Sequence, residues 1–229
     1  MNRIYLDNCA NTPVAPEVID AMMETLQRGG NPSSIHHEGR QAHRRLTEAR
    51  AAVAHSLGAR PAEIVFCGSG TEANNIAIGG LISKAIRTTG RARVVTSPVE
   101  HASIRTRLTW EKRRHQDALE IVEIAVDSAG GLDMDQLAAS ITDDTTLVAF
   151  LLVNNETGVV QDIDALKRLK LARPGVPFLL DAVQAHGKIP LDVRLLPFEL
   201  LSFSAHKIYG PSGIGALFVR GGVELDPLV

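Results

Sequence analysis

The segment 146–153, with the sequence TLVAFLLV, constrains the fold of this 229-residue chain more than any other. A strand with one face in solvent alternates apolar and polar residues, whereas this segment is almost wholly apolar. It therefore predicts a strand buried on both faces, as in a parallel sheet covered by helices. Shorter apolar runs that we also expect to form strands occupy 63–66, 93–96, 119–124, 177–180, 198–203 and 214–219.

Helical patterns fill the intervals between these strands. Pro16 begins the first of them, and apolar residues recur after it at helical spacing. The other expected helices run through 38–57, 71–89, 102 onward, 133–140 and 162–172. Strands that alternate with helices are typical of α/β folds. We therefore expect a mostly parallel open sheet with helices on both faces.

Polar and titratable residues follow the ends of several predicted strands. In open parallel sheets, ligands bind beyond the carboxyl ends of the strands, so these residues are candidates for one site. The candidates are Gly70, Thr71, His101, Asn155, Asp181, Gln184, Ser204, His206 and Lys207.

The turn Gly68-Ser-Gly-Thr71 stands between a predicted strand and a predicted helix. Glycines let the backbone approach an anion, and the free amide groups of a helix start point toward it. We interpret the turn as a phosphate cradle, although a plain strand-to-helix turn could have this sequence. The pattern Gly68-x-Gly70-x-x-Ala73 also fits a loose dinucleotide fingerprint. That fingerprint needs an acidic residue near the end of the next strand, where Thr96-Ser-Pro98 stands instead.

Lys207 lies in a short segment between two predicted strands, 198–203 and 214–219. A semi-buried setting of this kind lowers the pKa of a lysine by desolvation and makes its amine nucleophilic. Asp181 ends an apolar strand, where its carboxylate needs a partner, and a protonated ring nitrogen would be suitable. The alternatives are that Asp181 caps a turn or pairs with Lys188.

Three further candidates suit a planar ligand. His101 can stack on a ring or transfer a proton, and the amides of Asn155 and Gln184 can bind a hydroxyl or an oxyanion; singly, such residues are more often structural. Together with Lys207, Asp181 and the phosphate cradle they are the parts needed to bind pyridoxal 5'-phosphate (PLP). The lysine would form the Schiff base, and the carboxylate would keep the ring nitrogen protonated.

Composition argues against several other classes. The net charge of −2 without a basic face disfavours a nucleic-acid partner, and no apolar run reaches the roughly 18 residues of a membrane span. Cys9 and Cys67 are far apart and form no CxxC pair, so we expect neither a disulfide framework nor a metal site. We expect a cytoplasmic protein.

The ordered motifs resemble the class V aminotransferase superfamily, and within it the cysteine desulfurases of the NifS/IscS type. The matching stretches are Tyr5-Leu-Asp-Asn8, Gly30-Asn-Pro-Ser33, Ser69-Gly-Thr-Glu72, Glu100-His101, the run 153–161, Asp181-Ala-Val-Gln184 and the run 202–211. The resemblance implies PLP-dependent transferase fold type I. It also implies an N-terminal segment, 1–15, followed by the PLP-binding large domain, 16–229.

The resemblance implies a role for each candidate residue. Lys207 would hold PLP covalently, and His101 would stack on the ring and assist proton transfer. Asp181 would bind the ring nitrogen and Gln184 the ring hydroxyl, while Asn155 would contact cofactor and substrate. The phosphate would be held by Gly70, Thr71, Ser204 and His206.

The resemblance also implies that parts of the enzyme are missing. In the family, a cysteine on a loop well beyond the lysine accepts the sulfur of the substrate as a persulfide, and the substrate becomes alanine. An arginine, also beyond the lysine, binds the substrate carboxylate. This sequence has no counterpart of either, and we interpret Cys9 and Cys67 as small buried residues. We expect the C-terminal small domain to be absent from a fragment, a truncated product or one half of a split protein, which alone would not complete desulfuration.

The implied function is PLP-dependent cysteine desulfuration that serves iron–sulfur cluster assembly or thiolation. Two alternatives stay open: a selenocysteine lyase or another class V lyase or aminotransferase, and a non-catalytic remnant that binds PLP or a partner chain. The expected partners are L-cysteine, a second copy or a separate C-terminal half, and a sulfur-acceptor or scaffold protein.

Overall fold

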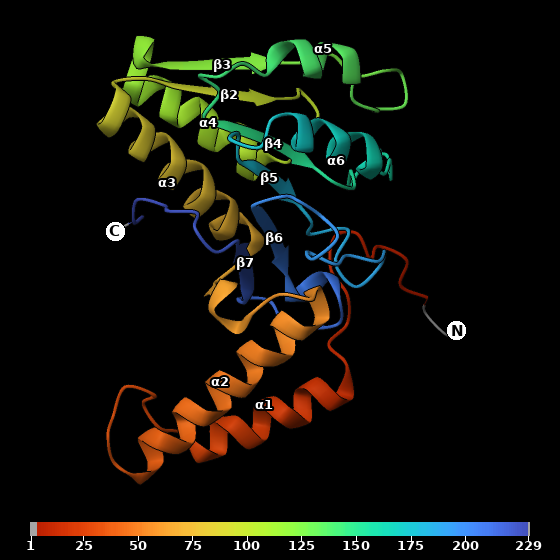
Figure 1. Ribbon diagram of the computed structural model, residues 1–229. Coiled ribbons are helices and arrows are strands. Elements are labelled where there is room, and N and C mark those ends of the chain that lie inside the picture. Colours follow the sequence, from red (N-terminus) through yellow and green to blue (C-terminus); the bar gives the residue numbers. More distant parts are fainter. Residues whose placement is uncertain (1–3, 229) are drawn as a thin grey trace.

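Seven strands form one sheet at the centre of the computed structural model, which describes residues 4–228 (Figure 1). Residues 1–3 of the predicted N-terminal segment and residue 229 lie outside the described residues. The order across the sheet is β1-β7-β6-β5-β4-β2-β3. The strands are β1 (Ile64–Cys67), β2 (Ala92–Thr96), β3 (Leu119–Glu123), β4 (Leu147–Leu151), β5 (Phe178–Asp181), β6 (Leu200–Ser204) and β7 (Gly215–Val219).

The sheet is mostly parallel, as predicted. The neighbours β6, β5, β4, β2 and β3 pair in parallel, whereas β7 is antiparallel to both β6 and β1. The chain returns from β6 to β7 through a short loop, 205–214, without a crossover helix. Such a short connection places consecutive strands antiparallel. The carboxyl ends of the parallel strands therefore share one edge of the sheet.

Helices cover both faces of the sheet, which confirms the second part of the fold prediction. The helices α3 (Gly70–Thr89) and α4 (Ala102–His115) pack on one face, and α5 (Met134–Ser140) and α6 (Ile163–Ala172) on the other (Figure 1). Adjacent strand residues face opposite layers: Val94 packs with α3 and α4, and Val95 packs with α5 and α6. This explains why the strands lack a polar face.

Two further helices form an arm that extends away from the sheet (Figure 1). They are α1 (Pro16–Arg28), which buries none of its residues, and α2 (His37–Leu57), whose end enters the core through Ala54 and Leu57. Short 3-10 turns occupy η1 (Pro61–Glu63), η2 (Gln116–Ala118) and η3 (Ala205–Lys207).

The chain before α1 crosses to the loop that carries the candidate lysine. Thr12 donates to the His206 carbonyl through both its amide, at 2.9 Å, and its hydroxyl, at 3.0 Å. The Thr12 hydroxyl also accepts from the Tyr209 amide at 2.7 Å. These bonds fix the N-terminal segment beside the end of β6. Within residues 4–228, no helix is both long enough and apolar enough to span a membrane.

Candidate active site

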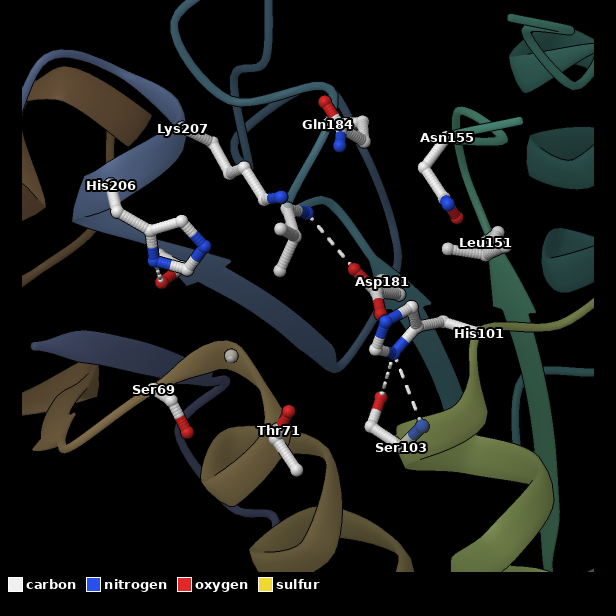
Figure 2. Close-up of a pocket in the computed structure, with 13 residues that line it drawn as sticks. Ser69, Thr71, His101, Ser103, Leu151, Asn155, Asp181, Gln184, His206 and Lys207 are labelled. Carbon is white, nitrogen blue, oxygen red and sulfur yellow. Dashed lines mark hydrogen bonds between the residues drawn. The ribbon is translucent and has the colours of Figure 1, made fainter. Parts of the chain in front are cut away.

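One pocket at the carboxyl edge of the sheet contains all nine candidate residues (Figure 2). Its volume is about 250 Å³, which is below the usual range for drug-sized ligands and suits one small ring with its substituents. The residues that line it are Ser69, Gly70, Thr71, His101, Ser103, Leu151, Asn155, Asp181, Val183, Gln184, Ser204, His206 and Lys207. The sequence thus predicted which residues meet.

The start of α3 forms one wall of this pocket. Ser69 is the N-cap, and its hydroxyl accepts from the Glu72 amide at 3.1 Å. The first amides of a helix have no intrahelical acceptor, so those of Gly70 and Thr71 remain available to an anion. A Cβ atom added to Gly70 would lie 2.5 Å from Val183 Cγ2. The close approach of the helix start to the β5 loop therefore requires glycine.

Asp181 ends β5, and its side chain is buried. Its Oδ1 accepts from the Val183 amide at 3.0 Å, and its Oδ2 accepts from Asn74 Nδ2 at 2.7 Å. Burial raises the pKa of Asp181, while these two hydrogen bonds oppose the shift. The bond to Val183 fits the turn-capping alternative. Lys188, the other partner considered, bonds to Gln184 instead.

A second buried carboxyl group, that of Glu100, contacts the pocket residue Leu151. Its oxygens are 2.5 Å from Ser97 Oγ and 2.5 Å from the Leu151 amide, so it links the chain after β2 to the end of β4. Burial, together with the charge of Asp181, raises the pKa of Glu100 to about 8. The group is therefore mostly protonated at neutral pH.

His101 follows Glu100 directly and caps α4. Its Nδ1 accepts from the Ser103 amide at 3.1 Å and lies 2.8 Å from the Ser103 hydroxyl (Figure 2). A backbone amide can only donate. The neutral ring therefore carries its proton on Nε2, and the cap fixes its orientation at the pocket.

The strand β6 ends at Ser204, and η3 carries His206, which lies on the opposite side of the pocket from His101 (Figure 2). The Ser204 hydroxyl is 2.9 Å from His206 Nδ1. Desolvation, followed by the charge of Lys207, lowers the pKa of His206. Both side chains offer hydrogen-bond donors near the start of α3, where an anion would be bound.

Lys207 is half-buried at the end of η3. Its Nζ donates to the carbonyls of Cys9, at 2.5 Å, and Ala10, at 2.7 Å. Desolvation lowers the pKa of Lys207, and the charge of Lys188 adds to the shift. The predicted direction of this pKa shift is confirmed.

Gln184 and Asn155 complete the rim. Gln184 Nε2 donates to the Cys9 carbonyl at 2.8 Å, and its Oε1 accepts from Lys188 Nζ at 2.7 Å. Asn155 lies in the loop after β4, and its Nδ2 donates to Glu156 Oε1 at 2.8 Å. The two neutral amides lie on the part of the rim that faces away from the start of α3 (Figure 2).

Sequence reasoning missed the residue that supports Asp181. Asn74 is fully buried in α3 and donates to both Asp181 Oδ2 and the Ser103 hydroxyl, the latter at 2.9 Å. The available signal was the position of Asn74 on the same apolar face of the helix as Ala73, Ala77 and Ile78. A polar side chain on a buried face needs hydrogen-bond partners.

The interpretation of both cysteines as buried was wrong for Cys9. Cys9 is exposed, because the N-terminal segment crosses the surface beside the pocket. Cys67 is half-buried at the end of β1, and its thiol donates to the Ser69 carbonyl. Burial raises the pKa of Cys67, which disfavours a reactive thiolate there.

The fold and the pocket together define an α/β domain with a small pocket at the carboxyl edge of its sheet. A model of the Aminotransferase class-V family matches residues 4–228. The chain therefore belongs to the class V aminotransferase family.

Within that family the chain is similar to cysteine desulfurases. It is 41% identical to cysteine desulfurase IscS of Dictyoglomus turgidum over 228 residues, which cover 99% of this chain and 56% of the relative. It is 43% identical to cysteine desulfurase IscS of Photorhabdus laumondii over 221 residues, which cover 95% of this chain and 53% of the relative. The chain thus spans about half the length of the curated relatives it matches.

Solved structures give the same similarity. A NifS-like protein superposes with a TM-score of 0.93 at 32% identity, over 100% of this chain and 62% of that one. A structure described as SspA in complex with cysteine superposes with a TM-score of 0.91 at 34% identity, over 99% of this chain and 65% of that one.

Proposed function

We propose that the pocket binds PLP and that it is the cofactor site of a cysteine desulfurase. The observation that carries the proposal is the convergence of Lys207, Asp181 and the start of α3 on one small pocket. An amine, a buried carboxylate and an anion-binding helix start are the three groups that PLP requires. The similarity to proteins named cysteine desulfurase supports cysteine as the substrate.

The phosphate would be held at the start of α3. The amides of Gly70 and Thr71 and the positive end of the helix macrodipole favour a dianion there. Ser204 and His206 would add two donors from β6 and η3. Gly70 has no side chain, and a Cβ atom there would lie 2.5 Å from Val183 Cγ2, so a larger residue would disturb this side of the phosphate site.

The ring would lie between His101 and Asp181. A buried carboxylate is costly unless it is paired, and a protonated ring nitrogen would supply a charge-assisted hydrogen bond. Asn74 orients Asp181 for this contact. His101 would stack on the ring, with Nδ1 facing Ser103 and the Nε2 proton on the other side of the imidazole. The Gln184 amide would donate to the ring hydroxyl. Asn155 would contact cofactor and substrate from the rim.

Lys207 would attach the cofactor through its amine. Desolvation and Lys188 lower the pKa of Lys207, so a larger fraction of the amine is neutral and nucleophilic at neutral pH. Bound PLP supplies an electron sink for negative charge at the substrate Cα. The lysine and His101 are the groups placed to move protons there.

We further propose the identity of the substrate and partners. L-cysteine is the substrate, a sulfur-acceptor or scaffold protein takes the sulfur for iron–sulfur cluster assembly or thiolation, and the site works in a cytoplasmic homodimer. The names of the relatives support the substrate. Neither Cys9 nor Cys67 is proposed as the sulfur acceptor, so we expect no sulfide release from cysteine by this chain alone.

PLP absorbance tests the proposal. Addition of PLP to the purified chain should give a visible absorbance band that borohydride bleaches, and Lys207→Ala should abolish it. The control is Lys112→Ala. The pocket residue His101 caps the N-terminal end of α4, and Lys112 lies near the other end of that helix, away from the pocket. A band that is unchanged in Lys207→Ala would show that PLP attaches elsewhere.

A further inference from the structure

We propose that Lys188 is a positioning residue of this site, which fixes the donor direction of the Gln184 amide and presents a second cation to Lys207. The proposal rests on the proposed function for the ligand it serves, and on contacts of the chain itself for its geometry. The implied residue roles do not include Lys188.

The first observation is the chain of contacts that joins the two lysines. Lys188 Nζ donates to Gln184 Oε1 at 2.7 Å, and Gln184 Nε2 donates to the Cys9 carbonyl at 2.8 Å. The same carbonyl accepts from Lys207 Nζ at 2.5 Å. An ammonium can only donate. Lys188 therefore holds the amide oxygen outward, and the Nε2 donor faces the side of the pocket where Lys207 lies.

The second observation is that the backbone holds Lys188 in this place. Gly187 packs against Ile208, the neighbour of Lys207, and a Cβ atom added to Gly187 would lie 2.9 Å from Ile208 Cγ2. Gly187 also has a φ of +74°, which favours glycine. The Lys188 amide donates to the Ala185 carbonyl at 3.0 Å and closes the turn. The turn and the lysine loop are thus packed together.

The charges around Lys207 come from several elements. The cation of Lys188 favours the neutral amine, whereas Asp7 and Cys9 of the N-terminal segment and Asp181 of β5 favour the charged form. His206 lies beside Lys207 on the same turn. Removal of Lys188 would remove the positive charge that opposes the acidic groups. The Lys207 amine should then keep its proton to higher pH.

Three substitutions separate the two effects. Lys188→Met removes donor and charge, Lys188→Gln keeps a neutral donor, and Lys188→Arg keeps both. Lys112→Met is the matched control for the loss of an exposed lysine. Urea midpoints of all variants separate a folding defect from a local effect.

The first readout needs no cofactor. Modification of Lys207 by a small amine-reactive reagent is followed by peptide mass spectrometry from neutral to alkaline pH. In Lys188→Met and Lys188→Gln, the rate at neutral pH should fall roughly two- to fivefold, the size expected of an exposed charge pair, and the profile should move to higher pH. Lys188→Arg and Lys112→Met should match the wild type.

The second readout is the affinity for PLP, measured by its visible absorbance. Lys188→Met should weaken binding roughly two- to tenfold, the size of one hydrogen bond, and more than Lys188→Gln does. A Lys188→Met variant with both the wild-type modification profile and the wild-type affinity would overturn the proposal. So would a Lys188→Arg variant that behaves as Lys188→Met. If the wild type binds no PLP, the proposed function fails, but the modification profile still decides whether Lys188 acts on Lys207.

Discussion

The buried Glu100 carboxyl predicts a specific dependence of stability on pH. Its folded pKa is about 8, against 4.5 for an ordinary glutamate. Between these values the folded chain keeps the proton and the unfolded chain releases it, so the contribution of Glu100 to stability is fully present below pH 4.5 and is lost as pH rises toward 8. The slope approaches about 1.4 kcal/mol per pH unit, which amounts to roughly 2–3 kcal/mol between about pH 5 and about pH 7.

Glu100→Gln isolates this effect. In the wild type, the Ser97 hydroxyl and the Leu151 amide each donate to a Glu100 oxygen at 2.5 Å. The glutamine carbonyl can still accept from the Leu151 amide, and its NH₂ group can donate to Ser97 Oγ. Urea denaturation of both proteins across this pH range gives the free energy of unfolding. The wild type should lose roughly 2–3 kcal/mol relative to Glu100→Gln from about pH 5 to about pH 7.

The control for this measurement is Glu48→Gln, which replaces an exposed glutamate of α2 and should follow the wild type. Parallel stability curves for Glu100→Gln and the wild type would refute the reasoning. That result would mean that Glu100 is ionised in the folded chain despite its burial.

Four further substitutions test the pocket. Gly70→Ala places a Cβ atom 2.5 Å from Val183 Cγ2 and should weaken PLP binding in an absorbance titration, and a second substitution, Val183→Ala, should restore part of it. Asn74→Ala leaves an oxygen of Asp181 unpaired and should lower the free energy of unfolding, measured in urea, by about 1–3 kcal/mol. Asp181→Asn keeps the size of the side chain but removes the carboxylate that would face the ring nitrogen, so PLP binding in the same absorbance titration should weaken; unchanged binding would contradict this account of Asp181.

The sheet and its edge could be predicted from the sequence because burial on both faces leaves a direct pattern. The run 146–153 has no polar face, and in the structure β4 is buried throughout. Once a parallel sheet is expected, the residues after its strands must share one edge. This argument alone brought Thr71, His101, Asp181 and Lys207 together, and they line one pocket.

The supporting contacts could not be predicted, because they depend on long-range packing. The N-terminal segment has no apolar periodicity that would place it beside β6, so the bonds from Lys207 to the carbonyls of Cys9 and Ala10 left no local signal. The reversal of β7 depends on the short loop that precedes it. Glu100 belongs to one of the stretches that match the family, but its link to Leu151 depends on the register of β4 beside β2.

Reduction of the PLP-loaded chain with borohydride, followed by peptide mass spectrometry, tests the central claim most directly. The account predicts one phosphopyridoxyl label, attached to Lys207. A label on Lys188 or another lysine, or no label at saturating PLP, would contradict it.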